Sequence, residues 1–149
     1  MAKSLDHVCI LVKDIDQAME RYGKILSVMA PEALDERVEK HEQRAGKDRY
    51  LTAVFVAPGD GCNIQLLQPL DPESPLYKRL ERHGEHIHHL AFTSPHLEET
   101  VKRLKDNGVS LYSDKLVNDG ETSSTRWTWI VPRYAHGALI EVMDEVQRP

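Results

Sequence analysis

Four polar side chains with the ligand chemistry of a divalent cation stand at matching places in the two halves of this 149-residue chain. His89 follows His7 by 82 residues (89 − 7), and Gln65 and Glu141 follow these histidines by 58 (65 − 7) and 52 (141 − 89) residues, each within an apolar run. Burying an unpartnered amide or carboxylate costs on the order of 1–3 kcal/mol, whereas imidazoles, an amide oxygen and a carboxylate around one cation satisfy one another. The four residues therefore predict a metal site with coordination positions open to a substrate.

The predicted ligand set contains no thiolate and mixes nitrogen with oxygen. Such a set suits Co²⁺, Ni²⁺, Zn²⁺, Mn²⁺ or Fe²⁺ and differs from a calcium site or a structural zinc finger. Strand alternation would turn His88 to the face opposite His89 and put His86 on the face of His88, so both are predicted at the surface or a cavity rim. The remaining four of the eight histidines are expected in solvated positions: His41, His83, His96 and His136.

The elements that must position these residues repeat along the chain. Leu5–Val12 aligns with Ile87–Ser94, and both segments have the pattern of strands. A helix is predicted after each, over Asp16–Leu26 and Leu97–Asn107, while the charged stretch Pro31–Gly46 is expected to be a loop or an irregular edge. Further strands are expected around Val38 and at Leu51–Ala57, Asn63–Leu67, Val109–Tyr112, Arg126–Val131 and Ala138–Met143.

Capping signals mark where the helices begin and end. Asp14 resembles the first residue of a capping box, and Ser94, followed by proline, predicts the N-cap of the helix after the second repeated strand. Between the halves, Ser74 and the proline after it open a short connector helix, Leu76–Arg82, which Gly84 can end.

The repeated unit is therefore β-α-β-β-β. Two small sheets of this kind cannot each bury a face alone, so we expect an α+β fold in which the two modules form one curved, cupped mixed sheet with the helices outside and a cavity inside the curve. The chain is expected to be a single domain over residues 1–149, with module 1 at about 5–69, the connector helix at about 74–84 and module 2 at about 86–145.

Composition narrows the classes of partner. The chain has 19 Lys and Arg against 24 Asp and Glu, a net charge of −5, and no basic run, so a nucleic acid partner is not expected. No stretch has the length of a membrane span or the pattern of a signal peptide, so no membrane partner is expected either. Cys9 and Cys62 lack disulfide or metal spacing and are predicted to be buried thiols, which fits a reducing cytoplasm.

Together these residues resemble the vicinal oxygen chelate superfamily, which includes glyoxalase I, extradiol dioxygenases, antibiotic-resistance proteins and methylmalonyl-CoA epimerase. The resemblance covers nearly the whole chain, and Leu66–Leu70, Ser74–Leu76 and Ile87–Phe92 look most like methylmalonyl-CoA epimerase. The resemblance, with the exposed edges of two short sheets, implies a homodimer. It gives the metal four ligands: His7, Gln65, His89 and Glu141.

The same resemblance implies an epimerase or isomerase of a carbonyl compound, an acyl-CoA thioester such as methylmalonyl-CoA. The metal would chelate two substrate oxygens and stabilise an enolate, while Glu141 removes the proton α to the carbonyl. The chain departs from the epimerases in the substrate wall Glu121–Tyr134, and Ala53 offers no second carboxylate. The partner acid is then a ligand water or an unassigned side chain.

Three alternatives stay open. A glyoxalase I-type lactoylglutathione lyase would use the same site on a glutathione hemithioacetal, and an extradiol dioxygenase would need only two histidines and a carboxylate, leaving Gln65 unexplained. A metal-free, resistance-type binding protein would line the cavity with aromatic side chains, namely Trp127, Trp129 and Tyr134. Three cations could hold either a glycyl carboxylate or the phosphates of CoA: Arg21, Arg126 and Arg133.

Overall fold

The computed structural model describes residues 5–113, 115–118 and 125–145, so Glu121–Ser124 of the expected substrate wall lie outside the described residues. In chain order the elements are β1 (Leu5–Leu11), α1 (Ile15–Met29), a 3-10 turn (Pro31–Leu34), β2 (His41–Ala45), β3 (Asp48–Phe55), β4 (Asn63–Pro69), α2 (Pro75–His83), β5 (His86–Ser94), α3 (Leu97–Asp106), β6 (Val117–Asn118), β7 (Arg126–Ile130) and β8 (Ile140–Asp144).

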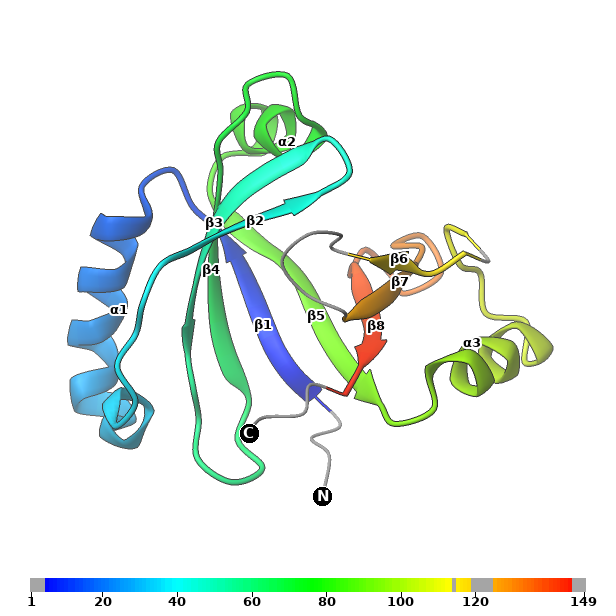
Figure 1. Ribbon diagram of the computed structural model, residues 1–149, viewed down its shortest axis with the longest axis horizontal. Helices are drawn as coiled ribbons and strands as arrows, with labels where there is room; N and C mark the ends of the chain where they lie inside the picture. The colour runs from blue at the N-terminus through cyan, green and yellow to red at the C-terminus, as the bar shows by residue number, and fades with distance from the viewer. Residues whose placement is uncertain (1–4, 114, 119–124, 146–149) are drawn as a thin grey trace.

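The strands form one mixed, curled sheet of eight strands in the order β2-β3-β4-β1-β5-β8-β7-β6. β1 and β5 pair antiparallel at its centre, and each has a parallel neighbour on its outer side, β4 beside β1 and β8 beside β5. The two halves thus repeat the same strand order outward from the centre, with α1 on one flank and α3 on the other (Figure 1). The predicted α+β cupped sheet with helices outside is confirmed.

One face of the sheet is covered by the two flanking helices. In the first half, Ile15 and Leu26 of α1 pack against Leu66 of β4 and Phe55 of β3. In the second half, the same role falls to a cluster of α3 with β7 and β8: Leu97, Val101, Ile130 and Val142. Because side chains alternate along a strand, this packing leaves the neighbouring residues of each strand on the opposite face, which carries the polar residues of the predicted site.

That opposite face has an apolar core of its own at one end. Leu80 of α2 packs there with Leu11 of β1, Leu67 of β4 and Tyr50 of β3. The connector helix predicted at Leu76–Arg82 is therefore confirmed as α2, and it closes one end of the face that holds the polar residues.

Three of the predicted helix boundaries follow from their caps. The Asp14 carboxylate accepts a hydrogen bond from the Gln17 backbone N–H at 3.1 Å, and the Ser74 hydroxyl accepts one from the Tyr77 N–H at 3.2 Å. Gly84 ends α2 with a φ of 72°, a conformation that glycine adopts without strain.

The predicted N-cap at Ser94 is wrong. His96 is the residue before α3, and Ser94 lies two positions earlier. Its hydroxyl accepts a hydrogen bond from the His96 N–H at 3.1 Å and bonds the Thr100 hydroxyl at 2.7 Å. The serine therefore ties the end of β5 to the first turn of α3 instead of capping that helix.

Two of the predicted strands are displaced. The strand expected around Val38 is β2, which lies within the stretch expected to be a loop, while Val38 itself packs against the α1 core. The strand expected at Val109–Tyr112 is reduced to one bridge, Leu111 to Ile130, and β6 lies further along the chain. Val109 and Leu111 are apolar because they pack on the α3 cluster, and not because they form a strand.

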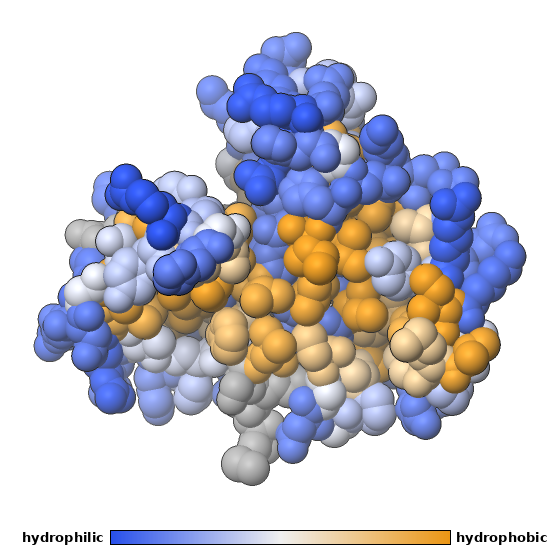
Figure 2. All heavy atoms as spheres, turned by 180° about the vertical axis from the view of Figure 1, so that it is seen from behind, coloured by the Kyte–Doolittle hydropathy of each residue, from blue (hydrophilic) through white to orange (hydrophobic). Residues whose placement is uncertain are grey.

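Large apolar side chains remain exposed outside these cores. Ile87 of β5 is 63% exposed, Phe92 of the same strand 37%, and Ile25 of α1 46%. Figure 2, which views the molecule from behind, shows hydrophobic side chains gathered across its middle. Clustered apolar surface of this kind is typical of a contact with another molecule. In the described part of the chain, none of the helices has the length and apolar character to span a bilayer.

Candidate metal centre

The strand register brings all four predicted ligands to the same face of the sheet. Partners in register share a face, and so do alternate residues of one strand. Two rows of register partners therefore cross the centre of the sheet on the face opposite α1 and α3: Gln65–Cys9–His89 and Glu141–Ala91–His7. Each row holds one predicted ligand from each module, separated by one small residue.

Three of the four predicted ligands converge closely. The Nε2 atoms of His7 and His89 lie 3.1 Å apart, and the His89 Nε2 lies 3.4 Å from a Glu141 carboxylate oxygen. One ligand atom from each of the three residues lies within 4.8 Å of the others, and all three residues are buried. Gln65 is half-buried on the same face, in the row of His89.

The hydrogen bonding of His7 tests whether these atoms fit a metal ion. Its Nδ1 lies 2.7 Å from an Asp6 carboxylate oxygen, which can only accept a hydrogen bond when ionised. A neutral His7 then carries its proton on Nδ1 and points the Nε2 lone pair at His89 Nε2 and the Glu141 carboxylate. In the metal-free site a His89 Nε2–H can donate to this lone pair, whereas a cation among the two Nε2 atoms and the carboxylate would satisfy all three at once, so the donor set fits a divalent ion.

Burial shifts the pKa values of Glu141 and His89. It raises the pKa of Glu141 to about 7, which the charge of Asp6 reinforces and that of His7 opposes. Burial also holds the pKa of His89 well below its usual value, and the positive forms of His88 and His7 lower it further. The buried site therefore keeps the His89 imidazole neutral, as a metal ligand must be.

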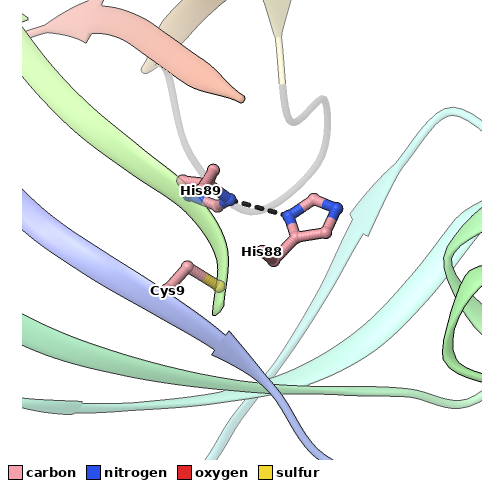
Figure 3. A group of neighbouring side chains, drawn as sticks. All are labelled: Cys9, His88 and His89. Carbon is pink, nitrogen blue, oxygen red and sulfur yellow. Dashed lines mark hydrogen bonds between the residues drawn. The ribbon is translucent and has the colours of Figure 1, made fainter. Parts of the chain in front are cut away.

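The prediction that His88 faces away from His89 is wrong. Cys9 pairs with His89 and the next residue of β1, Ile10, pairs with Ile87, so His88 is an extra residue in β5. Such a bulge breaks the alternation of faces. His88 is buried, its Nδ1 lies 2.8 Å from His89 Nδ1, and Figure 3 shows the two rings pointing toward each other near the Cys9 thiol. Sequence alternation alone gave no sign of this neighbour.

The other histidines lie outside the site. His86 is half-buried, with its Nδ1 2.7 Å from the Gly84 carbonyl oxygen and its Nε2 accepting a hydrogen bond from Arg79 at 3.1 Å. The four histidines predicted to be solvated are exposed, as expected: His41, His83, His96 and His136.

The aromatic residues named in the alternatives differ in their placement. Trp129 is the register partner of Glu141, and its ring meets that of His89 edge-on with centroids 5.1 Å apart. Trp127 is half-buried on the same face of β7, two residues away, whereas Tyr134 is 48% exposed. Trp129 therefore forms a wall of the candidate metal centre.

Arg126 is occupied by acidic partners. Its guanidinium bonds the Asp144 carboxylate at 2.8 and 3.0 Å and also contacts Glu98, and these bonds hold the pKa of Asp144 below its usual value. Arg21 and Arg133 are exposed. Both cysteines are free thiols, with Cys9 buried as predicted and Cys62 only partly buried.

The chain matches a known superfamily. Residues 6–127 match the family model described as the Glyoxalase/Bleomycin resistance protein/Dioxygenase superfamily. The chain belongs to this superfamily, which confirms the resemblance read from its repeated motifs.

Its relatives with known structures include methylmalonyl-CoA epimerases. The Mycobacterium tuberculosis enzyme is 31% identical, with 98% of this chain and 90% of that chain covered and a TM-score of 0.76. A Streptomyces coelicolor methylmalonyl-CoA epimerase in complex with 2-nitronate-propionyl-CoA is 25% identical over the full length of both chains, with a TM-score of 0.72. An uncharacterized protein of Bacillus subtilis (strain 168), YqjC, is 28% identical over 140 residues, covering 94% of this chain and 91% of YqjC.

Proposed function

We propose that this protein is a divalent-metal-dependent epimerase or isomerase of an acyl-CoA thioester such as methylmalonyl-CoA, and that the whole chain acts as one vicinal-oxygen-chelate unit. The convergence of His7, His89 and Glu141 on one face of the sheet carries this proposal. The 31% identity with the Mycobacterium tuberculosis methylmalonyl-CoA epimerase supports the choice of substrate class.

Four residues would hold the ion: His7, Gln65, His89 and Glu141. When bound, an ion of this class (Co²⁺, Ni²⁺, Zn²⁺, Mn²⁺ or Fe²⁺) supplies Lewis acidity that stabilises negative charge developing on a thioester oxygen. The nitrogen and oxygen donors of the centre suit such ions. The residues between the proposed ligands in each row, Cys9 and Ala91, have small side chains that fill little of the space beside the ligand atoms.

Glu141 is the proposed base for the α-proton. Its carboxylate is the acidic member of the converging group, and burial raises its pKa to about 7, so it takes a proton more readily than an exposed glutamate. The Trp129 ring lies edge-on against His89 on this side of the site. The proton would pass from one face of the α-carbon to a Glu141 oxygen, and a water molecule would deliver a proton to the opposite face, which inverts the configuration.

The second acid of a two-sided epimerisation is not Ala53. That residue is 1% exposed and packs in the α1 core, on the face away from the candidate centre. On β3, the side chain in the row of Gln65 belongs to Val54, which has no titratable group. A single carboxylate and a water molecule are therefore the proposed proton carriers.

Exchange of the α-proton tests the function directly. Metal-loaded protein is incubated with methylmalonyl-CoA in D₂O, and deuterium at the α-carbon is followed by NMR or mass spectrometry. We expect exchange in the native protein, loss of most of it in Glu141→Gln, and none after chelation. Metal-loaded native protein that leaves the α-proton untouched would reject this substrate, and an ultraviolet assay with methylglyoxal and glutathione would then test the lyase alternative.

We also propose a homodimer formed through the exposed apolar surface of β5 and α1. Ile87 is 63% exposed on β5, a position where a solvated strand would carry a polar side chain. Light scattering of the native protein should give twice the mass of the 17.0 kDa chain, and Ile87→Lys should shift it toward the monomer. Lys105→Glu, a substitution on exposed α3, is the control and should leave the mass unchanged. A monomeric native protein refutes the dimer alone.

A further inference from the structure

The two central strands each carry one bulge, and the two bulges occupy equivalent places in the repeat. In β1, Leu5 pairs with Phe92 and His7 pairs with the adjacent Ala91, so Asp6 is an extra residue. In β5 the extra residue is His88, which follows Asp6 by 82 positions (88 − 6), the spacing that relates His89 to His7. Each bulge thus comes immediately before a proposed metal-binding histidine.

The side chain of each bulged residue lies within hydrogen-bonding distance of the Nδ1 atom of the histidine that follows it. Asp6 Oδ2 lies 2.7 Å from His7 Nδ1, and His88 Nδ1 lies 2.8 Å from His89 Nδ1. In a regular strand, consecutive side chains point to opposite faces and cannot meet in this way. The bulges interrupt regular strand pairing at two positions, and they place Asp6 beside His7 and His88 beside His89.

We infer that His88 is a positioning residue for the proposed metal site: its Nδ1 accepts a hydrogen bond from His89 Nδ1–H and so directs the His89 Nε2 lone pair at the ion. This inference rests on the proposed function, because an Nε2 that binds a cation carries no proton, which leaves the proton of a neutral His89 on Nδ1. His88 then does for the second module what Asp6 does for the first.

The hydrogen bond between His88 and His89 also bears on whether Cys9, His88 and His89, drawn in Figure 3, form a metal site of their own. A metal held by these three residues would need the lone pair of His89 Nδ1. That lone pair is not available while His89 Nδ1–H donates to His88 Nδ1, which lies 2.8 Å away. The short contact matches a hydrogen bond between the rings, and the Cys9 thiol packs beside it.

Two variants, His88→Leu and His88→Asn, distinguish the effect of losing the hydrogen-bond acceptor from the effect of changing the packing. Leu and Asn are close in size, but only Asn offers an oxygen to His89 Nδ1–H. We expect Co²⁺ or Zn²⁺ affinity, measured by competition with a chromophoric chelator, to fall 10- to 100-fold in His88→Leu and to stay near native in His88→Asn. The control is His86→Leu, since His86 bonds Gly84 and Arg79 instead of a ligand, and its affinity should be unchanged.

Nitrogen-detected NMR of the Zn²⁺-loaded native protein gives a second readout, in which His89 should show a protonated Nδ1 and a metal-bound Nε2. The inference is overturned if His88→Leu binds the ion as tightly as the native protein, or if His88→Leu and His88→Asn are weakened alike. A sulfur-to-cobalt charge-transfer band that Cys9→Ser abolishes also overturns it, because the ion would then lie at Cys9. Native protein that binds no ion at all refutes the proposed function itself, an outcome distinct from the other three.

Discussion

Replacing Glu141 by Gln should stabilise the metal-free protein at alkaline pH and destabilise the metal-loaded one. Burial raises the pKa of this carboxyl from 4.5 to about 7. Each pKa unit corresponds to about 1.4 kcal/mol, so holding the charged carboxylate in the folded, metal-free site costs on the order of 3 kcal/mol. Glutamine has nearly the same shape and no charge, and it removes this penalty.

The sign of the pH dependence follows from the direction of the shift. Because the folded-state pKa lies above the unfolded one, the folded protein holds the Glu141 proton more tightly, and stability falls as pH rises through the window from about 4.5 to 7. Above that window the penalty is complete and constant. The advantage of Gln over Glu in metal-free protein should therefore grow by about 2.5 kcal/mol between pH 5 and pH 8.

A bound divalent ion should reverse this order, since Glu141 would then be a ligand. Each tenfold loss of metal affinity in Glu141→Gln removes about 1.4 kcal/mol of the stabilisation that saturating metal confers. Urea unfolding at pH 5 and pH 8, with chelator and with Co²⁺, measures all four free energies of unfolding for each protein.

The exposed Glu145→Gln is the matched control and should show neither effect. Equal stability differences between native and Glu141→Gln protein at pH 5 and pH 8 would refute the buried-charge reasoning. A Glu141→Gln variant that gains as much stability from Co²⁺ as the native protein would show that Glu141 is not a ligand.

Three further outcomes test other parts of the fold. Leu66→Ala empties a fully buried position under α1 and should lower the free energy of unfolding by about 2–5 kcal/mol in urea titrations. A thiol reagent should label the partly buried Cys62 in the native protein and reach Cys9 only on unfolding, and rapid labelling of both would contradict the burial of Cys9. Arg126→Gln should destabilise the protein at neutral pH. The stability difference should vanish in acid. Because the pKa of Asp144 is lower in the folded protein than in the unfolded one, its ion pair stabilises the fold fully above the unfolded-state pKa and no longer does so below the folded-state pKa. A stability difference that persists in acid would contradict this.

Because the chain contains an internal repeat, the strands and the candidate ligands could be predicted from the sequence. A polar residue inside an apolar strand is conspicuous, and the spacing of 82 residues between His7 and His89 selects two such strands. Once β1 and β5 pair at the centre of the sheet, alternation alone puts Gln65 and Glu141 on the face of these histidines. The site was predictable to the extent that it depends on regular strands.

Where the strands are irregular, the prediction failed. A bulge adds one residue and leaves no mark in composition, so His88 was assigned to the wrong face. β2 has the sequence His-Glu-Gln-Arg-Ala, and this edge strand needs no apolar alternation because none of its residues is fully buried on either face. Its position depends on pairing with β3, a contact between segments that a local pattern does not contain.

The two modules divide the charge of the candidate site between them. Module 1 places its carboxylate behind a histidine, as Asp6, and an uncharged amide in the ligand row, as Gln65. Module 2 does the reverse, with neutral His88 behind its histidine and the carboxylate of Glu141 in the row. Two carboxylates in total would balance one bound divalent cation, whereas a strict repeat of either module would not provide this arrangement of one inner and one outer charge. Without the ion, the inner carboxylate is the one that burial penalises, which is why Glu141 has the raised pKa.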